Sequence, residues 1–194
     1  MKKIIQEDVD IELLLRPESA IEKAILEDPD FQKGLFWGKP RFGHPEGQIV
    51  YHIQEVFENV DRMNQSPSVR AKLRLITLIH DTFKYLEDKS THPRDWSKHH
   101  AVYARKFFEK FTDDESLLKI VELHDEAYYA WRMKYIYQDF EGSKLRLDNL
   151  LKEIGDDIQL YYLFFKCDTC TGDKNQAPMK WFERTIKGIE LVSL

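Results

Sequence analysis

Residues 66–84 read SPSVRAKLRLITLIHDTFK and combine a helix start with a histidine–aspartate pair. Ser66 followed by Pro67 favours the start of a helix, because proline fits the first helical turn. Apolar residues then recur at helical spacing, at Val69, Leu73, Ile76 and Ile79. The stretch therefore predicts a helix that carries His80 and Asp81 close to a core.

The neighbouring segments show the same periodicity. Upstream, one apolar stripe in residues 48–60 consists of Ile49, Ile53, Val56, Phe57 and Val60. His52 lies beside that stripe. Downstream, a polar loop over residues 87–98 precedes a second stripe in residues 101–111, and His100 projects onto its apolar face. Helices thus flank the pair on both sides, each with a histidine.

The rest of the chain is also expected to be helical. Asp113 is predicted to cap a helix that ends near His124, because a carboxylate can accept the unpaired amide hydrogens of a first turn. Residues 144–154, 158–168 and 177–192 are predicted to be helices separated by glycine-containing breaks. No region demands a strand, so the predicted fold class is all-α, a single-domain helical bundle.

Length and composition favour one globular domain. The chain has 194 residues, of which 42% are hydrophobic and 32% charged. We divide this domain, residues 1–194, into an N-terminal helical extension (1–40), a metal-site core (41–170) and a C-terminal helix (171–194).

Charge and hydropathy exclude several classes of partner. A net charge of -5 argues against wrapping duplex nucleic acid but leaves a single nucleotide as a ligand. The apolar run at residues 160–165 is too short to cross a membrane, and residues 1–8 turn acidic before a signal peptide develops. Cys167 and Cys170 are too few for a disulfide framework and are expected to be small core residues rather than a zinc or redox site. These features predict a cytoplasmic protein.

The main chemical signal is the set of seven histidines, several of which accompany apolar helical faces. Divalent metals need imidazole and carboxylate ligands that converge from different elements, and a helical bundle supplies them from facing helices. His80 and Asp81 diverge by about 100° if both are helical. A metal between them needs ligands from other helices, for which His52 and Asp168 are the candidates.

The order of these residues resembles the HD superfamily, in which a histidine, a His-Asp doublet, further histidines and a final aspartate follow one another. Residues 43–47 (GHPEG) and 78–84 (LIHDTFK) are similar to the HD domain of bacterial tRNA nucleotidyltransferases. Residues 99–104 and 121–125 match the order of the additional histidines, and residues 165–168 look like the closing aspartate segment. The resemblance implies an HD-type helical bundle.

The resemblance also implies a ligand set. It assigns one or two divalent ions per chain, without distinguishing Mn, Mg, Co, Ni, Fe or Zn. The implied ligands are His52, His80, Asp81 and Asp168, with His100 and His124 binding a second metal or the substrate phosphate. His100 is preferred to His99 because it shares the apolar face and precedes Ala104 by four residues, but that choice stays open. His92 is expected to be a solvated loop residue.

The implied activity is a metal-dependent phosphohydrolase, which cleaves a phosphomonoester or phosphodiester of a nucleotide or other small molecule with a metal-activated water. Asp81 is predicted to be a ligand and proton acceptor. Lys84, His100 and His124 are expected to bind the phosphate and stabilise negative charge. His44 is placed at the mouth of the pocket and is also expected to bind the substrate.

Alternatives remain open. One alternative is a mixed-valent di-iron oxygenase of the same superfamily, which uses a similar six-ligand order. The other is a non-catalytic nucleotide-binding HD module, against which the complete set of ligands argues, because such a module does not need it. The aromatic residues of 128–137 are expected to pack rather than to stack a nucleobase. A homodimer is also left open.

Overall fold

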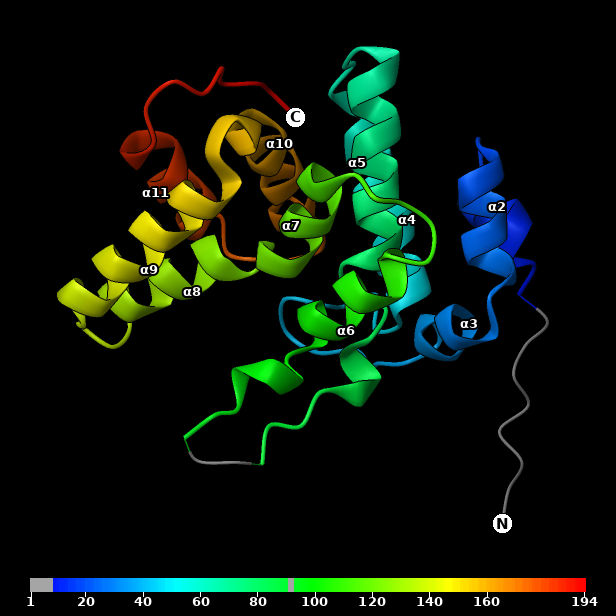
Figure 1. The fold of residues 1–194 in the computed structure, drawn as a ribbon, viewed down its shortest axis with the longest axis horizontal. Coiled ribbons are helices and arrows are strands. Elements are labelled where there is room, and N and C mark those ends of the chain that lie inside the picture. Colours follow the sequence, from blue (N-terminus) through cyan, green and yellow to red (C-terminus); the bar gives the residue numbers. More distant parts are fainter. Residues whose placement is uncertain (1–8, 91–92) are drawn as a thin grey trace.

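The computed structural model describes residues 9–90 and 93–194, and in this part of the chain the regular structure is helical (Figure 1). The α-helices are α1 (Ile11–Leu15), α2 (Ala20–Glu27), α3 (Pro29–Leu35), α4 (Ile49–Arg62), α5 (Pro67–Ile79), α6 (His100–Phe108), α7 (Glu115–Leu123), α8 (Glu126–Tyr135), α9 (Phe140–Ile154), α10 (Ile158–Thr169) and α11 (Ala177–Thr185). Short 3-10 helices are η1 (Lys84–Leu86), η2 (Trp96–Lys98) and η3 (Gly155–Asp157). The predicted all-α class is confirmed.

Side-chain caps set where the helices begin. Ser66 accepts the amide hydrogen of Val69 and Pro67 occupies the first position of α5, as predicted. The expectation that Asp113 caps α7 is wrong, because Asp114 accepts the amide hydrogens of Ser116 and Leu117 at 3.0 and 3.4 Å. Two adjacent aspartates offer the same capping chemistry, so the sequence does not distinguish them.

Two predicted helix ranges differ from the structure. Helix α9 begins at Phe140 rather than at residue 144, because Asp139 caps it by accepting the amide hydrogen of Gly142 at 2.8 Å. Helix α11 ends at Thr185, whereas the prediction extended it to residue 192. The backbone of Ile186 is extended and Gly188 has a φ of 81°, so the last residues leave the helical path.

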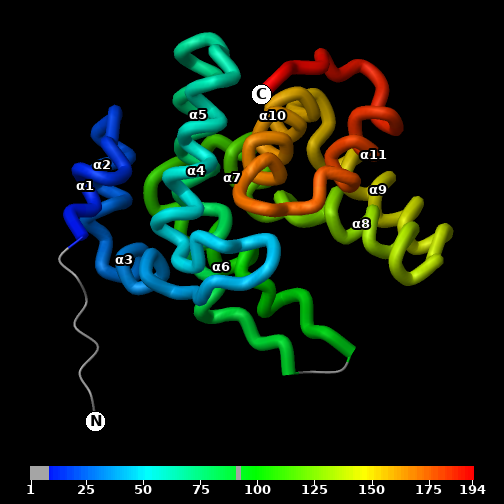
Figure 2. The backbone as a smooth tube through the Cα atoms, turned by 180° about the vertical axis from the view of Figure 1, so that it is seen from behind, coloured from blue at the N-terminus to red at the C-terminus, as the bar shows by residue number. Residues whose placement is uncertain are grey.

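One hydrophobic core runs through the described residues. Helices α4 and α5 stand side by side in its middle, and α10 packs against both (Figures 1 and 2). Helices α1 to α3 lie at one end of the molecule, and α8 and α9 pair as a hairpin at the other. The core cluster includes residues from Leu15 to Ile186. The division at residues 40 and 170 stays a prediction.

Two buried polar contacts fix elements around this core. Asn59 in α4 donates to the carbonyl oxygens of Cys167 and Cys170 at 2.9 and 3.0 Å, which locks the end of α10 onto α4. Arg74 in α5 pairs with Glu22 in α2 at 2.9 Å, and both side chains are buried. The first contact matters for the site, because His52 and Asp168 lie on these two helices.

Among the described residues, none of the helices combines the length and the apolar composition needed to cross a membrane.

Candidate metal centre

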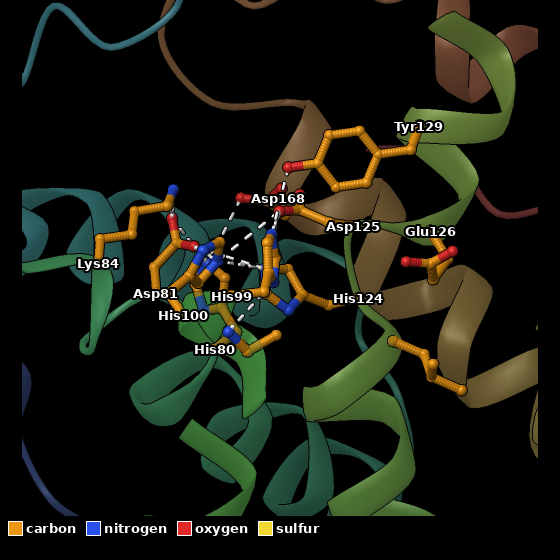
Figure 3. A network of polar contacts seen from close by, with 12 residues as sticks. His80, Asp81, Lys84, His99, His100, His124, Asp125, Glu126, Tyr129 and Asp168 are labelled. Atoms are coloured by element: carbon orange, nitrogen blue, oxygen red, sulfur yellow. Dashed lines mark hydrogen bonds and ion pairs between the residues drawn. The ribbon is translucent and has the colours of Figure 1, made fainter. Parts of the chain in front are cut away.

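Four of the predicted ligands, His52, His80, Asp81 and Asp168, meet where α4, α5 and α10 converge. Figure 3 shows three of them, His80, Asp81 and Asp168. His52 Nε2 lies 2.9 Å from Asp168 Oδ1 and 3.8 Å from Asp81 Oδ2. His80 Nε2 lies 3.5 Å from Asp81 Oδ2 and 3.7 Å from Asp168 Oδ1. His80 is the residue that caps the C-terminal end of α5, so Asp81 lies in the following turn rather than in the helix. The structure brings these four side chains together.

A second group shares Asp81 with the first. Asp81 Oδ1 lies 3.2 Å from His100 Nε2 and 3.4 Å from His124 Nε2, and the two imidazole nitrogens are 3.3 Å apart. His100 begins α6 and His124 ends α7. The two oxygens of Asp81 therefore face different groups: Oδ2 faces His52 and His80, and Oδ1 faces His100 and His124.

All four imidazole rings turn Nε2 toward Asp81, and three of them hold Nδ1 in a hydrogen bond on the outer side. The Nδ1 atoms of His80 and His124 lie 2.9 and 2.8 Å from the carbonyl oxygens of Thr77 and Val121. The other two face carboxylates: His100 Nδ1 lies 3.2 Å from Glu87 Oε2, and His52 Nδ1 lies 3.3 Å from Glu46 Oε1. Outer partners of this kind orient histidines that bind metals.

The inner atoms fit a divalent cation. His80 Nε2 is buried and has no hydrogen-bond partner, although its Nδ1 is satisfied. A buried unpaired polar atom is costly, and a cation next to it removes that cost. The buried side chains could hold a metal in two overlapping sets, one of His52, His80 and Asp81, the other of Asp81, His100 and His124.

The electrostatics of the site also favour a cation. Burial opposes the ionisation of Asp81, but nearby Lys84 and His80 hold the pKa of this carboxyl well below its usual range. Burial alone would lower the pKa of His80, yet the carboxylates of Asp81 and Asp168 outweigh it and raise that pKa to about 9. The same anionic surroundings that favour a proton on His80 favour a metal ion.

A cavity of about 350 Å³ opens beside these ligands. Its polar lining includes Arg41, His44, Lys84, Asp125, Asp168 and Lys174. Lys84 pairs with Asp81, and Lys174 lies 2.8 Å from Asp168. The cavity therefore has ligand carboxylates at its base with two ammonium groups beside them.

The predicted substrate-binding residues do not all reach this cavity. His44, Lys84 and His124 line it, and His44 Nδ1 lies 2.8 Å from Glu46 Oε1. His100 is buried behind the lining. Its role as a direct contact of substrate therefore stays a prediction, whereas its place beside Asp81 is part of the structure.

His99 and His100 are both buried but face different partners. His99 Nε2 lies 3.2 Å from the Tyr129 hydroxyl and 3.5 Å from Asp125, whereas His100 Nε2 faces Asp81. The geometry therefore favours His100 as the partner of Asp81. His92 and residues 1–8 lie outside the described residues.

Sequence reasoning missed four charged residues of the site: Glu46, Glu87, Asp125 and Lys174. Glu46 stands in the GHPEG segment and Asp125 follows His124, so both had a signal beside a recognised histidine. Glu87 and Lys174 lie in polar stretches where nothing marks them. Only the packing of their loops against the histidines and Asp168 reveals them.

The expectation that the aromatic residues of 128–137 pack rather than stack a nucleobase stays a prediction, and Tyr128 and Tyr135 both contact the Trp131 ring. Tyr128, Tyr135 and Tyr137 are 38%, 53% and 60% exposed. Trp131 packs partly against the core, as predicted. Cys167 is also buried, as expected, and Cys170 is half-buried.

Comparison with protein families matches residues 49–154 to the HD domain. The match spans more than half of the chain and includes His52, His80, Asp81, His100 and His124. The chain therefore belongs to the HD domain family. No curated protein and no solved structure matches it. The resemblance to the HD domain of tRNA nucleotidyltransferases stays a prediction.

Proposed function

We propose that this protein is a metal-dependent phosphohydrolase that cleaves a phosphomonoester or phosphodiester of a nucleotide or another small phosphorylated molecule. One observation carries the proposal. Four imidazole Nε2 atoms converge on Asp81 beside a cavity that is also lined by Lys84 and Lys174. Metal ligands and phosphate-binding cations thus share one cavity.

The residues fit one or two divalent ions. His52, His80, Asp81 and Asp168 would hold the first, and Asp81, His100 and His124 the second. Metal ions bound there supply an activated water and polarise a phosphoryl oxygen. We assign Asp81 as the shared ligand.

The remaining side chains bind and orient the substrate. Lys84 and Lys174 present ammonium groups to the cavity, where they offset the charge of a phosphate. His44 also lines the cavity and is held by Glu46, so it can donate or accept one hydrogen bond at a fixed position. The proton-acceptor role predicted for Asp81 requires one of its present contacts to change, because Lys84, His100 and His124 already contact its oxygens.

A second candidate is a di-iron oxygenase, which the sharing of Asp81 between two groups of histidines favours. Imidazole and carboxylate ligands suit iron as well as other divalent metals. Two irons per chain, oxygen uptake and no release of phosphate would identify this activity.

Metal analysis of gently purified protein tests the proposal, together with hydrolysis of an aryl phosphate and of a nucleotide panel in manganese, cobalt, nickel or magnesium. We expect bound metal and phosphate release. Asp81→Asn should lose both, with activity down at least 100-fold. The matched control is Asp156→Asn, which removes an exposed carboxylate that neither lines the cavity nor belongs to a ligand set.

Full metal content and activity in Asp81→Asn would overturn the proposal. Thermal melting of both variants separates loss of the site from loss of the fold. If the wild-type protein binds no metal under any of these conditions, the remaining interpretation is a non-catalytic binding module.

A further inference from the structure

The cavity beside the metal centre has a buried end and an exposed end. Asp81 and His124 line the buried end, and both side chains are buried. Arg41 and Phe42 line the exposed end, and Phe42 is 84% exposed. The mechanism proposed above uses only the buried end.

The segment that carries Arg41 is firmly held. The Arg41 amide donates to the carbonyl oxygen of His44 at 3.0 Å, and the His44 amide donates back at 2.8 Å. Gly43 donates its amide hydrogen to Asp173 at 2.6 Å. Gly172 has a φ of +52°, and a Cβ there would lie 2.8 Å from Pro45. The loops before α4 and before α11 therefore interlock, and each contributes a cation to the cavity.

Arg41 differs from the other two cations that line the cavity. Lys84 pairs with Asp81, and Lys174 pairs with Asp168. Within the described ranges, 9–90 and 93–194, no carboxylate forms an ion pair with the Arg41 guanidinium. Acidic residues of the same loops have other partners: Asp173 accepts from Gly43, and Glu46 contacts His44 and His52.

This unpaired guanidinium suits a second anionic group on the ligand. Arginine binds phosphate through two parallel hydrogen bonds, which gives both affinity and orientation. The backbone of Arg41 is already fixed, so only its side chain has to be ordered when an anion binds.

The exposed end also offers aromatic surface. Phe42 and Tyr128 both line the cavity and are partly or largely exposed. Rings in such positions can stack on a nucleobase. A cavity of about 350 Å³ falls in the size range of small-molecule sites rather than of a single phosphate ion.

We propose that Arg41 and Phe42 form an outer subsite that binds a second phosphate group and the base of the substrate. The preferred substrate is then a nucleotide with two phosphate groups rather than a monophosphate. This inference rests on the proposed function, because the reacting phosphate is assigned to the buried end.

Titration calorimetry of the 194-residue chain, as purified, tests the subsite. The probes are inorganic phosphate, adenosine 5′-monophosphate, adenosine 5′-diphosphate and adenosine 3′,5′-bisphosphate, with phosphate release assayed in the same samples. We expect at least one two-phosphate nucleotide to bind tenfold or more tightly than the monophosphate. Arg41→Gln should remove that difference and leave monophosphate binding unchanged.

Lys39→Gln is the matched control, because it removes an exposed positive charge two residues away that does not line the cavity. It should bind all probes as the wild type does. Phe42→Ala should weaken the three nucleotides several-fold and leave inorganic phosphate unchanged. Arg41 and Phe42 are exposed, so we expect both variants to melt at the wild-type temperature.

Equal effects of Arg41→Gln and Lys39→Gln would overturn the inference, as would wild-type affinity in Arg41→Gln or failure of the nucleotides to bind. The proposed function fails separately. If the two-phosphate preference depends on Arg41 but no probe is hydrolysed with any metal, the subsite stands and the hydrolase does not. If an aryl phosphate is hydrolysed and Arg41→Gln binds every probe as the wild type does, the hydrolase stands and the subsite does not.

Discussion

The Nε2 atoms of His100 and His124 lie 3.3 Å apart, although the Nδ1 atom of each ring has a partner on the other side. Two imidazole nitrogens that both present lone pairs repel each other. A proton or a metal ion between them turns the repulsion into attraction. Together with Asp81 Oδ1 at 3.2 and 3.4 Å, this contact marks the second group as a place for positive charge.

Replacing one imidazole of this pair should reduce the stabilisation of the protein by added metal. We expect added manganese to raise the melting temperature of the wild-type protein, because a ligand that binds only the folded state stabilises it. His100→Gln should show a smaller rise and, where two ions bind, one ion fewer per chain by elemental analysis. A rise and an ion content equal to those of the wild type would contradict a ligand role for His100.

Glu87 should affect the metal affinity of the site that contains Asp81 without itself being a ligand of that site. Its Oε2 lies 3.2 Å from His100 Nδ1. Burial raises the pKa of Glu87, but the contact with His100 and the charges of Lys89 and His99 together outweigh burial and lower that pKa to about 2. Glu87→Gln keeps the shape of the side chain but removes its charge. Loss of such an outer partner typically costs 10- to 100-fold in metal affinity. A metal titration monitored by calorimetry measures the change in metal affinity.

The control for Glu87 is Glu109→Gln, which alters an exposed carboxylate that pairs with Arg105 at 3.1 Å. It should leave metal affinity unchanged. If both variants weaken metal binding equally, the effect comes from net charge and not from the orientation of His100.

The pair between Arg74 and Glu22 should dominate the attachment of the N-terminal helices. Both side chains are buried and 2.9 Å apart. Removing one partner of a buried pair leaves an uncompensated charge and costs about 3–5 kcal/mol. Glu18 also lies 3.5 Å from Arg74 and compensates part of the remaining charge, so we expect Glu22→Gln to lose about 3 kcal/mol, the lower end of this range, in the free energy of unfolding measured by urea denaturation.

An exposed pair provides the comparison for Glu22. Lys144 and Asp148 are 2.6 Å apart with side chains 78% and 53% exposed, so Asp148→Asn should change stability by less than about 1 kcal/mol. Similar losses in the two variants would mean that the buried pair contributes no more than a surface pair.

Acid should remove the stabilising effect of Glu183. Burial raises the pKa of this carboxyl, but hydrogen bonds with Lys166 and Tyr162 outweigh it and lower the pKa below the ordinary value of 4.5. A lowered pKa in the folded state stabilises the protein above the unfolded pKa, and the effect is lost as pH falls through the folded value. The stability difference between wild type and Glu183→Gln should be constant near neutrality and shrink below about pH 4.5.

Unfolding curves at a series of pH values measure that difference. The control variant Glu153→Gln removes an exposed carboxylate of α9. A difference for Glu183→Gln that grows toward acid would show that the carboxyl is not stabilised by Lys166.

Local sequence information predicted most of the helices, and the resemblance to the HD superfamily predicted the residues that meet around Asp81. The stripes around His52 and His100 predicted α4 and α6 because helical periodicity is a property of neighbouring residues. Its errors were local too: Asp113 and Asp114 are equivalent as caps in the sequence, and the extended backbone at Ile186 is not encoded by a strong break.

Tertiary packing alone decided how the ligands are arranged. His52 and Asp168 are 116 residues apart in the chain, yet they lie in contact. No local pattern indicates that Asp81 faces His52 with one oxygen and His100 with the other. The outer partners Glu46 and Glu87, the ammonium of Lys174 and the unpaired Arg41 also come from loops without periodicity. Directional contacts between distant segments depend on how α4, α5, α6 and α10 pack, and that packing is set by the whole core rather than by any one stretch of sequence.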